Sequence, residues 1–157
     1  MVYGESILTE KELNSMEKEI IERWEKGKEN LQKYLSTHKI ENTCESYEDL
    51  VKVLINQCLN YSKDYPIFST EFVCIDNGDY QGTQIFVLHY NTYQPNASDY
   101  YIFDNDYGSC SGCDTLLGII GYGSTDGFPN EDMVNKLITL CLHMVQRMKC
   151  IDNLWNE

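Results

Sequence analysis

The hydrophobic period of this chain changes twice, and this change limits its fold more than any other feature. Up to about residue 65, apolar residues recur at every third or fourth position, as on one side of a helix. From Phe68 to residue 106 they alternate or run continuously, as in β-strands, and the helical period returns after Asp114. Strands that are grouped between two helical parts predict a single α+β domain.

Two helices are expected before the strands. The capping pattern Thr9-x-x-Glu12 precedes an amphipathic run rich in Glu and Lys, which predicts a long helix over residues 10–36. Gly27 either weakens this helix locally or marks a bend. A second capping pattern, Ser46-x-x-Asp49, opens a broader apolar stripe and predicts a more buried helix that ends before Pro66.

Three strands are expected next, over residues 70–75, 83–90 and 100–103. The links between them are too short for parallel crossovers, so the strands should form an antiparallel meander. The first link contains Asp76-Asn-Gly-Asp79, a turn sequence that tolerates positive φ angles.

A short helix over residues 115–120 and a glycine-rich break follow, and then a last helix. Pro129 suits the first turn of that last helix, and the apolar stripe continues to Ile151. We therefore expect one α+β domain in which two N-terminal and two C-terminal helices pack on one face of a three-stranded antiparallel sheet. Within residues 1–157, its parts are a helical part (9–65), the sheet (68–106) and a cysteine-containing turn with the C-terminal helices (107–157).

The composition is strongly acidic, because 12 Lys and Arg face 25 Asp and Glu and give a net charge of −13. Such a charge repels phosphate backbones and anionic lipid, so we expect a protein partner with a basic face rather than nucleic acid or a membrane. No apolar run is long enough to cross a bilayer and no signal-peptide pattern is present, which predicts a cytoplasmic protein. Seven cysteines, an odd number, are expected as reduced thiols, with Cys58, Cys74, Cys141 and Cys150 buried.

The segment Tyr107–Asp114 is the first candidate for a functional site. It holds Cys110 and Cys113 in a glycine-flanked turn between a strand and a helix start, where backbone N–H groups can face a ligand. Three interpretations remain open: a structural or binding turn, a redox dithiol, and a zinc site that recruits Cys74 or His89.

Carboxylates are the second candidate. Asp76 and Asp79 lie in the first turn, and Asp104 and Asp106 lie close to the end of the third strand. They could pair to hold Mg²⁺ or act as acid and base, but turn-forming Asp on an acidic surface is the favoured interpretation, and no cofactor is expected. The spacing does not support a nucleophilic pair between a motif cysteine and a histidine, whether His89 or His143.

Two motifs, Asp79-Tyr-Gln-Gly-Thr83 and Tyr107-Gly-Ser-Cys-Ser-Gly-Cys-Asp-Thr-Leu116, resemble those of a family of small uncharacterised proteins from phages, bacteria and large DNA viruses. The resemblance covers residues 68–120. It supplies no activity, but it implies that the two motifs belong to one site or one structural unit. The Asn-, Tyr- and Ile-rich composition would suit an AT-rich viral genome.

We therefore expect a small acidic intracellular binding or regulatory module, in keeping with a viral source. Its recognition surface should lie at the sheet end where the two motifs meet. The alternative is a thiol-dependent redox or zinc-binding protein that uses the paired cysteines. The expected binding residues are Asp79, Tyr80, Gln81, Gly82, Thr83, Tyr107, Gly108, Ser109, Cys110, Ser111, Gly112, Cys113 and Asp114.

Overall fold

The chain folds as an α+β domain, which confirms the predicted class. The structure, a computed structural model, describes residues 6–62, 67–78, 81–108, 114–121 and 126–151, with side chains from Lys18 onward. None of the helices in these ranges is long and apolar enough to cross a membrane. The elements are α1 (Ser6–Thr37), η1 (Ile40–Asn42), α2 (Tyr47–Leu54), η2 (Ile55–Leu59), β1 (Val73–Asp76), β2 (Gly82–His89), η3 (Ala97–Asp99), β3 (Tyr100–Tyr107), α3 (Thr115–Ile120), α4 (Glu131–Arg147) and β4 (Lys149–Cys150).

The sheet has four antiparallel strands in the order β1-β2-β3-β4, one strand more than predicted. The additional strand, β4, pairs Lys149 with Ile102 and Cys150 with Tyr101. The prediction that these residues belong to the last helix is wrong, because that helix ends where Met148 adopts an extended conformation. The pairing satisfies backbone groups on the β3 edge that a longer helix would leave without partners.

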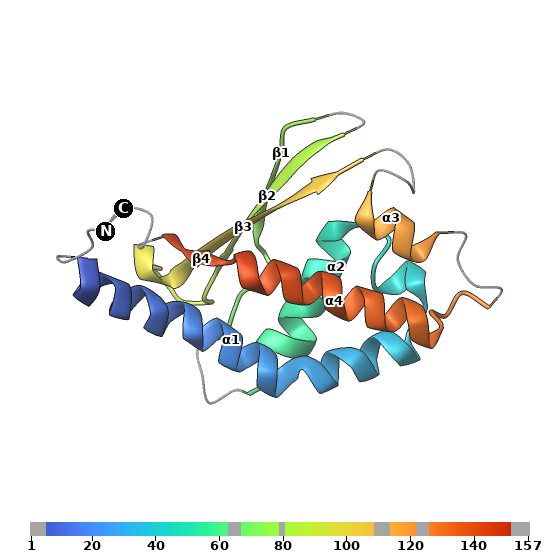
Figure 1. Cartoon of the computed structure of the whole chain (residues 1–157), viewed down its shortest axis with the longest axis horizontal. Helices are drawn as coiled ribbons and strands as arrows, with labels where there is room; N and C mark the ends of the chain where they lie inside the picture. Colours follow the sequence, from blue (N-terminus) through green and yellow to red (C-terminus); the bar gives the residue numbers. More distant parts are fainter. Residues whose placement is uncertain (1–5, 63–66, 79–80, 109–113, 122–125, 152–157) are drawn as a thin grey trace.

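The α-helices gather on one side of the sheet (Figure 1). Phe86 and Leu88 of β2 and Tyr101 and Phe103 of β3 alternate toward this side, and all four are buried. They join the side chains of α1, α2 and α4 in one hydrophobic core. The prediction that the helices cover a single face is therefore correct.

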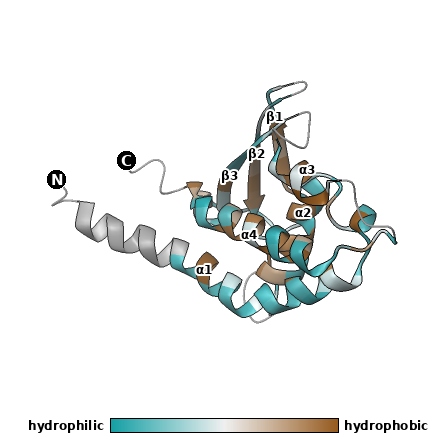
Figure 2. Ribbon diagram, turned by 45° about the vertical axis from the view of Figure 1, so that its right-hand side comes forward, coloured by the Kyte–Doolittle hydropathy of each residue, from teal (hydrophilic) through white to brown (hydrophobic). Residues whose placement is uncertain are grey.

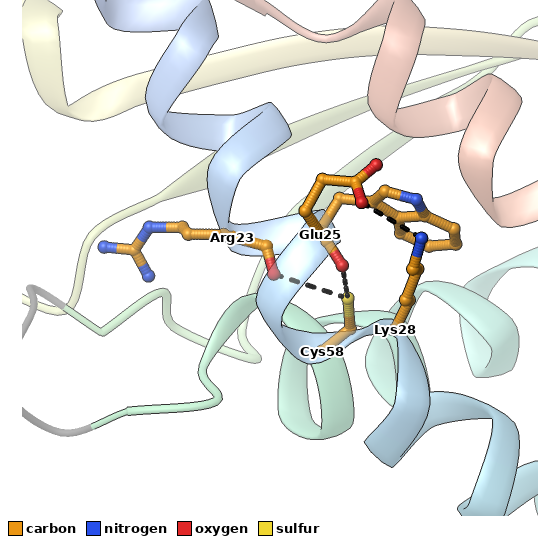
Figure 3. A network of polar contacts seen from close by, with 5 residues as sticks. Arg23, Glu25, Lys28 and Cys58 are labelled. Carbon is orange, nitrogen blue, oxygen red and sulfur yellow. Dashed lines mark hydrogen bonds and ion pairs between the residues drawn. The ribbon is translucent and has the colours of Figure 1, made fainter.

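The long helix α1 crosses the π-helical segment η2 at close range. A Cβ atom on Gly27 would lie 2.1 Å from the carbonyl oxygen of Cys58, so only glycine fits this crossing without movement of the backbone. The Cys58 Sγ lies 3.9 Å from the carbonyl oxygen of Arg23 and 3.8 Å from that of Trp24 (Figure 3). Gly27 therefore permits helix contact, and α1 continues through it.

Arg23 connects α1 to the strand side of the core. It is 2% exposed, and its Nη1 donates to the carbonyl oxygen of Leu59 at 2.8 Å. Its guanidinium lies 5.2 Å from the ring centre of Phe68 and 5.5 Å from that of Tyr90. The electrons of the two rings stabilise the buried positive charge. The Tyr90 hydroxyl donates to Glu19 at 2.6 Å, and burial together with this carboxylate raises the Tyr90 pKa.

Helix boundaries differ from the predictions where tertiary contacts intervene. The helix α1 begins at Ser6 rather than at residue 10, so Thr9 lies inside it and does not cap it. The Ser46 cap is confirmed, because its Oγ accepts a hydrogen bond from the Asp49 N–H at 3.1 Å. The second helix is α-helical only to Leu54 and continues as the π-helical η2, whose widened turn lies at the α1 crossing.

The last helix starts later than predicted. Asn130 caps α4 by accepting from the Met133 N–H at 2.8 Å, so Pro129 precedes the cap instead of occupying the first turn. Glu131 and Asp132 do lie in the first turn, where the helix dipole favours carboxylates.

We predict that Gly27→Ala destabilises the protein by about 1–3 kcal/mol, because the added methyl group meets the Cys58 backbone. The higher helix propensity of alanine, about 1 kcal/mol, offsets only part of the larger costs in this range. Urea unfolding followed by circular dichroism measures the change, with Glu29→Ala on the exposed face of α1 as the control. A Gly27→Ala protein as stable as the control would contradict the close crossing.

Candidate functional site

The described parts of the two motifs that lie in β2 and β3 are side by side at one end of the sheet. The register of β2 and β3 pairs Gly82 with Tyr107 and Thr83 with Asp106, which confirms the predicted contact between the motif segments. The Thr83 hydroxyl donates to the Asp106 carboxylate at 2.8 Å. The predicted site residues Asp79, Tyr80, Ser109, Cys110, Ser111, Gly112 and Cys113 lie outside the described residues.

The turn between β1 and β2 is held by its own polar groups. The Asn77 Oδ1 accepts from the Thr83 N–H at 2.9 Å, and the Asp76 carboxylate accepts from the Gly78 N–H at 3.0 Å. A Cβ atom on Gly82 would come within 2.9 Å of the Gly78 Cα, so these two glycines approach one another within the hairpin. The expected positive φ is absent from the described part of this turn, because neither Asn77 nor Gly78 adopts it.

Tyr107 ties the third strand to the first across the second. Its partner in the register is Gly82, which has no side chain, and its hydroxyl donates to the Asp76 carboxylate at 2.5 Å. The Tyr107 hydroxyl, with smaller contributions from the Gly78 N–H and Gln84, lowers the pKa of Asp76. The sheet end is therefore held by side chains as well as by its ladder.

Asp114 anchors both sides of the cysteine motif. One carboxylate oxygen accepts from the Gly108 N–H at 2.8 Å, before the motif cysteines. The other accepts from the Leu117 N–H at 3.0 Å, in the first turn of α3, and from the Tyr47 hydroxyl at 3.1 Å. Tyr47 in turn accepts from the Leu116 N–H at 3.2 Å, and burial raises its pKa to about 12.

Asp114 is only 7% exposed, so the fold itself uses this carboxylate. Among the carboxylates near the motifs, Asp106 is exposed and faces the same side of the sheet as Thr83. Asp106 therefore remains available to a partner, and Asp114 does not.

A polar cleft of about 290 Å³ lies beside this anchor. Tyr47, Asn105, Thr115, His143 and Arg147 contribute to its lining. The Arg147 Nε donates to the carbonyl oxygen of Asp104 at 3.1 Å, and its Nη2 donates to the Asn105 side-chain oxygen. Asn105 is buried, and its Nδ2 has no hydrogen-bond partner among the described residues.

Arg147 was not identified as a site residue from the sequence, and His143 was considered only as a partner of a motif cysteine. The available signal was that the two residues lie one turn apart on α4. The structure places Arg147 against β3, where the cleft forms.

His89 and Cys74, the two residues considered as further zinc ligands, do not face one another in the structure. His89 and Cys74 lie on opposite faces of the sheet, since Cys74 pairs with Phe86 and His89 pairs with Tyr100. The zinc site predicted from Cys110 and Cys113 with either Cys74 or His89 stays a prediction, because the two motif cysteines lie outside the described residues. Within the described ranges, no group of three His, Cys, Asp or Glu residues could hold a metal ion.

The cysteines outside the motif behave as core residues, apart from Cys74. Cys58, Cys141 and Cys150 are fully buried, as predicted, and burial raises the pKa of Cys58 to about 12 and raises that of Cys141 as well. Cys74 is half-buried, and burial followed by nearby carboxylates raises its pKa to about 11. These thiols are poor nucleophiles at neutral pH.

Comparison with known proteins adds no family: no family model, no curated protein and no solved structure matches this chain. The resemblance of the two motifs to small phage, bacterial and viral proteins therefore stays a prediction.

We predict that Asp114→Asn lowers the free energy of unfolding by about 1–3 kcal/mol, because the new amide group cannot accept from Gly108, Leu117 and Tyr47 together. Thermal and urea unfolding measure the loss. The control is Asp106→Asn, an exposed change for which about 0.5 kcal/mol or less is expected. Equal stability of the two variants would show that Asp114 does not anchor the motif.

Proposed function

We propose that this chain is a small acidic binding or regulatory module. Its recognition surface comprises the sheet end where residues 79–83 and 107–114 meet and the adjoining uncovered face of the sheet. The observation that supports this proposal is a sheet face on which Val73 and Ile75 are exposed, on the side of the strands away from the described helices (Figure 2). Exposed apolar patches of this kind mark interaction sites more often than isolated apolar residues do.

The outer face, as we call it, is defined by the strand register. The pairs Val73–Val87, Ile75–Ile85 and Val87–Ile102 place these five side chains on the side opposite the helices. Val73 and Ile75 are 52% and 51% exposed. β1 is also an edge strand, so its outer backbone groups border the same surface.

Carboxylates lie at one end of the outer face. Asp104 pairs with Ile85 and Asp106 pairs with Thr83, so both side chains follow the apolar patch toward the motif end. In a chain of net charge −13, this arrangement favours a protein partner whose apolar surface is bordered by Lys and Arg. A second copy of the chain would bring equal charges together across a symmetric interface, which disfavours self-association.

We predict that the outer face is required for partner capture. The chain is immobilised, proteins captured from host lysate are identified by quantitative mass spectrometry, and the affinity of the purified partner is measured at low and moderate salt. Val73→Ser/Ile75→Ser and Asp104→Asn/Asp106→Asn should each weaken that affinity by about tenfold or more, because they remove the apolar centre and the charged border. The wild-type association rate should fall as salt rises.

The matched controls lie on α1, where Ile21→Ser is a comparably exposed apolar change and Glu22→Gln/Glu29→Gln is a comparable charge change. Neither control should alter the affinity. Loss of binding in the controls with retention in the outer-face variants would place the site on the helix side. Ultracentrifugation of the pure chain tests for self-association. A dimer that is lost in Val73→Ser/Ile75→Ser would replace the proposed partner with a second copy.

The rival function is thiol-dependent chemistry at Cys110 and Cys113. What favours it is that Asp114 joins the described residues on either side of these cysteines, Gly108 at the end of β3 and Leu117 in α3. A redox pair needs at least one accessible thiol of low pKa. The two functions therefore differ in thiol reactivity.

We predict slow iodoacetamide labelling of Cys110 and Cys113 in the folded protein near neutral pH, as a structural turn requires. Mass spectrometry of the wild type, Cys110→Ser and Cys113→Ser assigns each rate, and the buried Cys58 is the unreactive reference. Rapid labelling of one motif thiol, suppressed by prior oxidation, would favour the redox function instead.

A further inference from the structure

A groove of about 470 Å³ lies beside β3, next to the first residue of β4. Ile85, Ile102 and Phe103 give it an apolar lining. Arg147 and Lys149, from the end of α4 and from β4, give it two cations. We call this hollow the edge groove.

No carboxylate among the described residues forms an ion pair with Arg147. The ion pairs among the described residues lie within α1 or between Lys136 and Asp132 of α4, and none includes Arg147. Its hydrogen bonds go to two neutral acceptors, the carbonyl oxygen of Asp104 and the side-chain oxygen of Asn105. These contacts fix the guanidinium in place and leave it N–H donors for a ligand.

The polar cleft and the edge groove share Arg147 and Asp104 in their linings. The cleft adds His143, one turn before Arg147, the exposed carboxylate of Asp106, and the buried Asn105 Nδ2, which has no partner among the described residues. Arg147 therefore lies where an apolar hollow meets a polar hollow. A ligand that satisfies both needs an apolar body and an acceptor group.

We propose that the edge groove binds an amphipathic carboxylate, with its apolar body against Ile85 and Ile102 and its carboxylate at the Arg147 guanidinium. Arg binds carboxylates through parallel N–H···O bonds, and the apolar lining gives the apolar body of the ligand a surface to cover. A cationic ligand is disfavoured, since Asp104 alone among the described lining residues carries a negative charge.

This inference does not rest on the proposed protein partner. The edge groove shares Ile85 and Ile102 with the outer face, but its test uses pure small molecules and the variants of Val73 and Ile75 are not part of it. Either proposal can fail while the other stands.

Two sources can supply this chemistry: a free medium-chain acid and the apolar C-terminus of a peptide. The probes are octanoate and octan-1-ol, and the peptide acetyl-Val-Leu-Val with a free or an amidated C-terminus. Binding to the full chain is measured by calorimetry and by ¹H–¹⁵N chemical-shift changes. The acid of each pair should bind more tightly than its neutral counterpart by about tenfold.

The variants separate the carboxylate contact from general hydrophobic binding. Arg147→Gln should weaken octanoate binding by about tenfold or more and leave octan-1-ol unchanged. Asp104→Asn should strengthen octanoate binding a few-fold, because it removes the repelling charge. Lys136→Gln, an exposed cation on α4 that pairs with Asp132, is the control and should have no effect.

Tighter binding of octanoate than of the peptide acid would identify a free acid as the ligand class, and the reverse order would identify a peptide C-terminus. Equal binding of acid and neutral probes, or no binding of either acid at millimolar concentration, would overturn the proposal. Should Arg147→Gln unfold the protein, Asp104→Asn decides, since unchanged octanoate affinity in that variant contradicts a carboxylate in the groove.

Discussion

The rest of the structure depends on the crossing of α1 over η2. The absence of a side chain at Gly27 lets the two backbones meet, and this close approach brings Arg23 into the core beside Phe68 and Tyr90. A buried guanidinium requires carbonyl and aromatic partners, and the carbonyl oxygen of Leu59 and the two rings supply them. The helical layer is thereby fixed against one side of the sheet.

A sheet covered on one side presents its other side to solvent. In most antiparallel sheets the solvent side is polar. Here β1 and β2 place Val and Ile on it, and β3 adds Asp104 and Asp106 toward the motif end. The uncovered face therefore combines a hydrophobic centre with negative charge at its motif end. This combination is the physical basis of the proposed recognition surface.

Membership of a sequence motif does not separate anchoring residues from contacting residues, but burial does. Asp114 belongs to the cysteine motif, yet its carboxylate holds Gly108, Leu117 and Tyr47. Arg147 lies outside both motifs, yet it joins two hollows and has no carboxylate partner among the described residues. The residue that anchors the motif, Asp114, and the residue proposed to contact a ligand, Arg147, are thus distant in the chain.

The sequence by itself determined the fold class, the helix-covered face and the meeting of the two motifs, because hydrophobic period and link length are local properties. It did not determine β4, the π-helical turn at η2 or the role of Gly27, since each depends on a backbone partner far along the chain. The same holds for the candidate site. Residues within the motifs were identified in advance, whereas His143 and Arg147 reach the cleft only because α4 packs beside the end of β3, a contact that tertiary structure alone decides.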